Sequence, residues 1–125
     1  MKNPIGWFDI HVEDMARAQR FYETVLNVEL STLDDPCDTQ MEMKAFPSNM
    51  ERYGATGCLV KMAGAPVGQN SVIVYFSCDD CATEEARVEA AGGKITQSKF
   101  SIGEFGFITM ATDSEGNTFG LHSYQ

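Results

Sequence analysis

Residues 7–26 read WFDIHVEDMARAQRFYETVL, and residues 72–91 read VIVYFSCDDCATEEARVEAA. Each stretch opens with an apolar run of β-favouring residues, passes through two acidic residues, and continues with apolar residues at helical spacing. Superposing Asp14 on Asp80 aligns the two stretches at an offset of about 66 residues. The chain therefore predicts two copies of one strand–helix unit.

The predicted helices carry end signals. Asp14 and Asp80 stand where a side chain can accept the free N–H groups of a first helical turn. Glu84 and Glu85 lie near the N-terminus of the second predicted helix, where the helix dipole favours negative charge. The pair Gly92-Gly93 is typical of a helix end, so we expect the second helix to run through Ala91.

Three more strand candidates follow each predicted helix. They are residues 28–33, 41–46 and 57–62 in the first copy, and 94–100, 106–112 and 118–123 in the second. Residues rich in Pro, Gly, Asn and Asp separate them at 34–38, 47–54, 101–104 and 113–117. The pattern predicts an α+β fold of two tandem βαβββ modules in a single domain. Module one spans 1–63, a linker spans 64–70, and module two spans 71–125.

Composition limits the possible partners and location. A chain of 125 residues with 43% hydrophobic content suits one domain, and a net charge of −9 argues against nucleic acid or an anionic membrane as partner. No apolar run approaches the roughly 18 residues of a membrane span, and no export signal is recognisable. We therefore expect a cytoplasmic protein.

The four cysteines are Cys37, Cys58, Cys78 and Cys81, and we expect reduced thiols in a cytoplasmic chain. Cys78 and Cys81 have C-x-x-C spacing, which can mark a redox pair or half of a zinc site. The two carboxylates between them disfavour thiolates, and no second C-x-x-C is present. A structural role is the preferred interpretation.

These stretches resemble the vicinal-oxygen-chelate superfamily of glyoxalases, bleomycin-resistance proteins and dioxygenases, and are most similar to its small predicted enzymes related to lactoylglutathione lyase. The resemblance covers nearly the whole chain in order and spacing. It is carried by residues 10–30, with VEDM, RA, FY and VLN, and by residues 74–80, 88–95, 102–107 and 112–117. It implies that the modules form a half-open cup around a small-molecule cavity and that the protein is a homodimer.

Metal-dependent members of that superfamily place one ligand, usually His or Glu, on the first and last strand of each module. The matching positions here are Trp7, Ile73 and Gly120, and the fourth strand, 57–62, contains no Asp, Glu or His. None of these offers a metal ligand, so no cofactor is predicted at the usual site. A divalent metal stays possible at a remodelled site, with Asp9, His11 and His122 as ligands for Zn²⁺ or Ni²⁺.

Strand alternation places Trp7, Asp9 and His11 on one face of the first strand, and Gly120 and His122 on one face of the last strand. If Trp7 and Gly120 take the ligand positions, both histidines point toward the cavity. A histidine near a carboxylate can act as a general base, so Asp9, His11 and His122 are the candidate catalytic residues. The candidate ligand contacts are Trp7, Met41, Met43, Lys61, Tyr75, Ser77 and Phe105. Strand histidines also occur at sheet edges or dimer contacts, methionine and aromatic positions suit plain core, and a lysine suits a solvated edge.

Three functions follow from this pattern. The preferred one is a metal-free binder of an aromatic or amphipathic small molecule. The second is a lyase or isomerase related to lactoylglutathione lyase, with acid–base or metal chemistry at Asp9, His11 and His122. The third is an interaction module without a ligand, which predicts bulky apolar side chains filling the space around Trp7 and Ile73.

Overall fold

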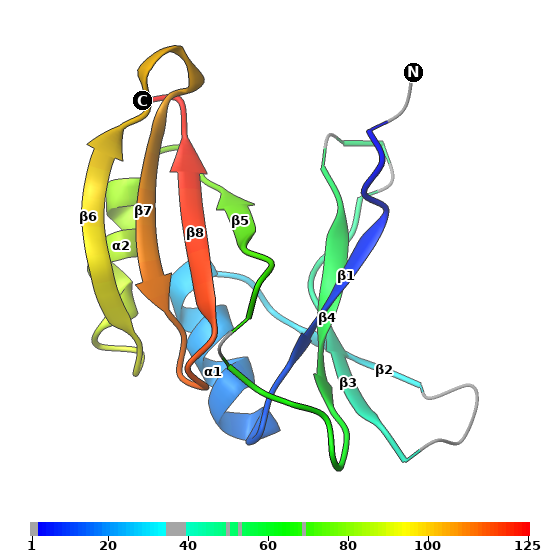
Figure 1. Ribbon diagram of the computed structural model, residues 1–125. Coiled ribbons are helices and arrows are strands. Elements are labelled where there is room, and N and C mark those ends of the chain that lie inside the picture. Colours follow the sequence, from blue (N-terminus) through cyan, green and yellow to red (C-terminus); the bar gives the residue numbers. More distant parts are fainter. Residues whose placement is uncertain (1–2, 35–39, 50, 53, 69) are drawn as a thin grey trace.

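The computed structural model describes residues 3–34, 40–49, 51–52, 54–68 and 70–125, and within these ranges it contains two four-stranded sheets (Figure 1). The first half contains β1 (Trp7–His11), α1 (Met15–Leu26), β2 (Ser31–Leu33), β3 (Glu42–Ala45) and β4 (Thr56–Lys61). The second half contains β5 (Val74–Ser77), α2 (Cys81–Val88), β6 (Lys94–Ser101), the 3₁₀ helix η1 (Gly103–Phe105), β7 (Phe107–Thr112) and β8 (Thr118–Ser123).

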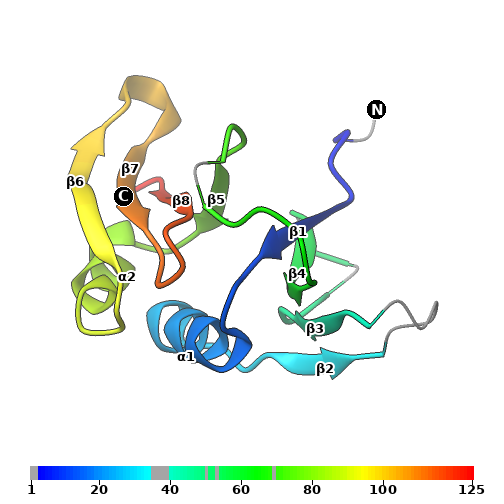
Figure 2. The ribbon, with the colours of Figure 1, turned by 60° about the horizontal axis from the view of Figure 1, so that its bottom comes forward.

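The two sheets share one topology. Their strand orders are β1-β4-β3-β2 and β5-β8-β7-β6, with the first strand parallel to the last and the remaining pairs antiparallel. Each half is therefore a βαβββ module, and the predicted fold class is confirmed. β1 and β5 are edge strands of their sheets, and each is the strand of its sheet nearest the other module (Figure 2).

Both predicted helix starts are confirmed. Asp14 accepts a hydrogen bond from the Arg17 backbone N–H at 3.1 Å, and Asp80 accepts one from Ala82 at 3.0 Å. α1 ends at Leu26, and the capping residue Asn27 that follows has a left-handed φ of 54°. The prediction for α2 was too long, because the helix ends at Val88 and hydrogen-bonded turns lead from there to Gly93.

Several predicted boundaries of strands and turns also differ. β2 begins only at Ser31, because the N–H of Leu30 donates to the Glu23 carboxylate at 2.9 Å instead of to a strand. β5 begins at Val74 rather than residue 72, so the stretch before it stays outside the sheet. The turn predicted at 101–104 contains η1, whose C-terminal Gly106 has a φ of 104° that favours glycine.

The core is shared by both modules, because α1 packs against both sheets (Figure 2). Tyr22 of α1 is fully buried, and its ring lies 5.6 Å from Phe46 of module one and 5.6 Å from Phe76 of module two. The ring of Phe119 in β8 lies 5.8 Å away. These edge-on and tilted contacts favour aromatic packing, so one cluster joins the two halves.

The three described cysteines, Cys58, Cys78 and Cys81, are free thiols, as predicted. Cys37 lies outside the described residues. Burial, followed by the nearby Glu84 charge, raises the pKa of the Cys78 thiol to about 12. Cys78 is therefore protonated at neutral pH and unsuited to thiol–disulfide exchange, which agrees with a structural role.

Candidate functional site: a cleft between the modules

Two hollows lie along the free edge of β1, and together we call them the inter-module cleft. The inner hollow has a volume of about 370 Å³ and the outer hollow about 500 Å³. Phe8, Val72 and Val74 line both, so the two hollows are neighbours. The inner hollow is also lined by Asp9, Ile10, His11, Tyr22, Pro66, Gly68, Asn70, Asn117, Thr118 and Phe119, and the outer by Asn3, Ile5, Trp7, Gly54, Ala55, Ile73 and Tyr75.

Asparagine side chains fix one end of the inner hollow. Asn117 donates through Nδ2 to the His11 carbonyl at 3.1 Å, and its Oδ1 accepts from the Gly68 N–H at 2.9 Å. Asn70 accepts from the Thr118 N–H at 2.9 Å. These bonds tie the linker and the start of β8 to β1, so the hollow is held open by specific contacts.

Large apolar side chains surround the outer hollow and remain accessible. Ile5 is 68% exposed, Val72 74%, Ile73 39%, and Trp7 and Tyr75 47% each. The Tyr75 ring lies over Gly120 of β8, where any Cβ would collide with that ring. Exposed apolar side chains that form one patch mark a binding site, whereas single scattered ones need no explanation.

Asp9 orients the Trp7 indole. The Asp9 Oδ1 atom accepts from Trp7 Nε1 at 3.0 Å and from the Cys58 thiol at 3.3 Å. Burial and, to a smaller extent, the hydrogen bond to Asp9 raise the pKa of that thiol to about 12. Cys58 therefore keeps its proton and stays a donor at neutral pH. Oδ2 of Asp9 accepts no hydrogen bond from the described part of the chain.

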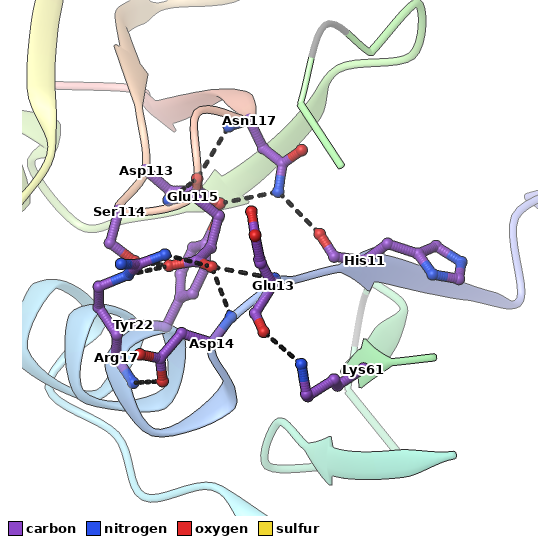
Figure 3. A network of polar contacts seen from close by, with 10 residues as sticks. All are labelled: His11, Glu13, Asp14, Arg17, Tyr22, Lys61, Asp113, Ser114, Glu115 and Asn117. Carbon is purple, nitrogen blue, oxygen red and sulfur yellow. Dashed lines mark hydrogen bonds and ion pairs between the residues drawn. The ribbon is translucent and has the colours of Figure 1, made fainter. Parts of the chain in front are cut away.

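His11 carries a buried polar atom without a partner. Its Nδ1 is buried and makes no hydrogen bond with any residue that the structure describes, and His11 is among the residues that line the inner hollow. Figure 3 shows the imidazole pointing away from the polar network that surrounds Glu115. A buried nitrogen that stays unpaired costs about 1–3 kcal/mol, so a ligand group or water molecule that pairs with this one would recover that free energy.

We expect His11→Leu to raise the free energy of unfolding by about 1 kcal/mol, because it removes the unpaired nitrogen and keeps an apolar body. His122→Leu is the matched control. It removes the 2.7 Å bond between Nε2 and the Phe105 carbonyl, so a loss of about 1 kcal/mol is expected. Urea denaturation of both variants tests this pair, and a loss of stability in His11→Leu would contradict it.

The structure brings four of the predicted site residues together: Trp7, Asp9, His11 and Tyr75 line the inter-module cleft. The others lie elsewhere. The Lys61 ammonium donates to the Glu13 carbonyl at 2.6 Å, His122 bonds to η1 and packs edge-on against Tyr124, and Phe105 is 65% exposed on η1. Met41, Met43 and Ser77 do not line the cleft.

Several cleft residues were not predicted from the sequence. Asn70 lies in the linker and Asn117 in the β7–β8 turn, and strand alternation says nothing about either place. Val72 and Val74 were interpreted as plain strand residues. The unusual apolar exposure of 72–75 follows from β5 being an edge strand, which only the sheet order reveals.

A second feature beside the cleft is a carboxylate that joins the modules (Figure 3). The Glu115 side chain has no solvent exposure and accepts from the backbone N–H groups of Glu13 and Asp14 at 3.0 and 2.9 Å. Arg17 pairs with it at 2.6 Å, and the Ser114 hydroxyl donates at 3.0 Å. The β7–β8 turn of module two therefore holds the start of α1 in module one.

A family model described as the Glyoxalase/Bleomycin resistance protein/Dioxygenase superfamily matches residues 4–121. The chain belongs to this superfamily. No curated protein matches it significantly. Among the described residues, no helix is long and apolar enough to cross a bilayer.

Solved structures share the fold at low sequence identity. Glyoxalase I from Zea mays superposes with a TM-score of 0.74 at 21% identity, covering 97% of this chain and 46% of the maize protein. The fosfomycin resistance protein FosX from Listeria monocytogenes gives 0.72 at 16%, covering 100% and 96%. TnmS3, an antibiotic binding protein from Streptomyces sp. CB03234, gives 0.68 at 22%, covering 99% and 98%. This chain spans about half the length of the maize enzyme.

The side chains at the superfamily's metal positions do not fit a metal ion. Trp7 and Ile73 offer no lone pair for coordination, and a ligand side chain at Gly120 would collide with the Tyr75 ring. Nowhere in the described ranges do three His, Cys, Asp or Glu side chains come close enough to hold a metal. Asp9, His11 and His122 therefore do not form the remodelled three-ligand site in this structure.

Proposed function

We propose that this protein binds a small organic molecule in the inter-module cleft and does so without the superfamily's usual metal. The observation that carries the proposal is the pair of neighbouring, largely apolar hollows, the outer of which is lined by the accessible Trp7 and Tyr75 rings. Hollows of about 370 and 500 Å³ fall within the size range of small-molecule sites. Aromatic rings with a few polar groups are the usual lining of such sites.

The fold neighbours support this class of function. TnmS3 is described as an antibiotic binding protein, so a domain of this fold and length can hold a small organic molecule. The cleft here is also not filled by its own side chains, since Trp7, Ile73 and Tyr75 remain accessible. A pure interaction module predicts the opposite, with bulky side chains closing the space around Trp7 and Ile73.

A second candidate is a lyase or isomerase that uses the same cleft. Asp9 and His11 line the inner hollow together, and a neutral imidazole can remove a proton from a bound substrate. His122 lies on the side of β8 that contacts η1, which argues for a reaction based on Asp9 and His11 alone. Turnover lost in His11→Ala but kept in His122→Ala would favour this candidate.

The homodimer and the cytoplasmic location stay predictions. Exposed apolar residues beside the free edges of β1 and β5 are suited to contact with a second copy. Sedimentation velocity of the tag-free protein tests the dimer directly. A monomer at all concentrations would restrict the ligand site to one chain.

The proposed function is tested by thermal shift against a library of small aromatic compounds, with metal analysis of the same tag-free protein. We expect stabilising compounds, no near-stoichiometric metal, and the same shift in the presence of chelator. Trp7→Ala should abolish the ligand-induced shift, whereas Phe105→Ala, an exposed ring outside the cleft, should keep it. Stoichiometric metal that is lost in His11→Ala would overturn the metal-free proposal.

A further inference from the structure

The described lining of the inter-module cleft contains one charged side chain, and it is acidic. Arg52 lines a neighbouring hollow that shares Trp7 with the outer one. Among the described residues that line the cleft itself, Asp9 is the only acidic side chain and no lysine or arginine is present. Lys61, the residue expected to contact an anionic substrate, is held at the Glu13 carbonyl instead. The whole chain has 18 acidic and 9 basic residues, which adds a negative field to that of Asp9.

The position of Asp9 suits a cation. Oδ1 is occupied by the Trp7 indole and the Cys58 thiol, while Oδ2 receives no hydrogen bond from the described residues. The indole that Asp9 orients is half exposed, and Tyr75 lines the same outer hollow. A positive charge at this place can form an ion pair with the free carboxylate oxygen and a cation–π contact with the accessible aromatic rings.

His11 adds a hydrogen-bonding group in the same place. His11, with its unpaired Nδ1, lies two residues from Asp9 on the same face of β1, and both residues line the inner hollow. An unprotonated imidazole nitrogen accepts a hydrogen bond, as a carboxylate does. A ligand that carries several N–H donors on one charged nitrogen satisfies both groups.

We propose that the ligand of this cleft is an arylalkylamine, an aromatic ring on a short alkyl chain that ends in a protonated amine. The ammonium group lies at Asp9 and His11, and the ring lies against Trp7 and Tyr75. This inference rests on the proposed small-molecule function and narrows it to one charge class. An anion would meet the Asp9 charge without any basic partner among the described lining residues, and a neutral ring would gain only apolar contact.

Trp7 is the only tryptophan of the chain, so its fluorescence reports on the cleft directly. Three probes with one phenyl skeleton separate the charge classes: 2-phenylethylammonium, 2-phenylethanol and 3-phenylpropionate. Titration at neutral pH and low salt should show the cation binding about tenfold more tightly than the anion and about threefold more tightly than the alcohol. Added salt should bring the affinity of the cation closer to the affinities of the anion and the alcohol.

Asp9→Asn keeps an acceptor for Trp7 Nε1 and removes the charge. It should weaken the cation about five- to tenfold and leave the alcohol within about twofold. Glu29→Gln, on an exposed loop residue outside the cleft, makes the same change in net charge and should alter neither. The ranking of the three probes on the unmodified protein needs no variant, so the test stands even if Asp9→Asn folds poorly.

The outcomes separate the two proposals. If the alcohol or the carboxylate binds as tightly as the cation, or Asp9→Asn leaves cation binding unchanged, the cation assignment is wrong while the cleft stays a ligand site. If none of the three probes changes Trp7 fluorescence, both the cation assignment and the proposed small-molecule function lose their support.

Discussion

Tyr22→Ala should lower the free energy of unfolding by about 3–5 kcal/mol, the largest effect of any substitution considered. The ring is fully buried and contacts the aromatic rings of Phe46, Phe76 and Phe119, so its loss leaves a cavity between the modules. The hydroxyl also donates to the Asp113 carboxylate at 2.5 Å. Burial and then the Asp113 charge raise the pKa of Tyr22 well above its usual value, which keeps this donor protonated.

Tyr22→Phe separates the two contributions. It keeps the ring and removes only the donor to Asp113, so a loss of about 1–2 kcal/mol is expected. Phe105→Ala is the matched aromatic control, because that ring is 65% exposed, and it should change stability by less than about 0.5 kcal/mol. Urea denaturation measures all three. A Tyr22→Ala variant as stable as the unmodified protein would contradict the shared core.

Glu115→Ala should lower the free energy of unfolding by about 2–3 kcal/mol. The substitution removes a buried carboxylate and leaves the N–H groups of Glu13 and Asp14, at the start of α1, without their acceptor. Arg17 is about half exposed, so solvent screens part of the ion pair and the loss stays below that of Tyr22→Ala. Urea denaturation at neutral pH measures the loss.

The same carboxylate gives stability a pH dependence. Burial alone would raise the pKa of Glu115, but the hydrogen bonds from Arg17 and the other donors outweigh it and lower the pKa from 4.5 to about 2. A pKa lowered by folding stabilises the protein above the unfolded value and loses that contribution as the pH falls from about 4.5 through about 2.

Glu115→Gln has no charge to lose over that pH range. The difference in stability between the unmodified protein and this variant should therefore be constant above about pH 5 and shrink below it. Urea denaturation across this range measures the difference. A gap that stays constant down to about pH 3 would show that the carboxylate pKa is not lowered by folding.

The sequence predicted the fold well because its signals were local. Acidic residues at both helix starts and alternating apolar residues in the strands reflect hydrogen bonding and burial within a few residues. Errors arose where a distant partner decides the structure. Leu30 is held by Glu23 of α1, and the start of β5 depends on which residues find a partner in β8.

The candidate site was only partly predictable. Alternation along β1 grouped Trp7, Asp9 and His11 correctly, since strand geometry fixes that grouping. The same argument could not show that His122 bonds to η1, because that contact depends on how the chain folds beyond β6. It could not reveal the inter-module cleft either, which arises from the placement of two edge strands.

The most direct test of the central claim is an NMR measurement of contacts between a stabilising compound and the single Trp7 indole N–H. If the inter-module cleft holds the ligand, nuclear Overhauser effects will connect the compound to Trp7 Nε1–H and to the Tyr75 ring. Contacts with His122 and Phe105 instead, with the Trp7 signal unchanged, would contradict the account and place the ligand on module two beside η1.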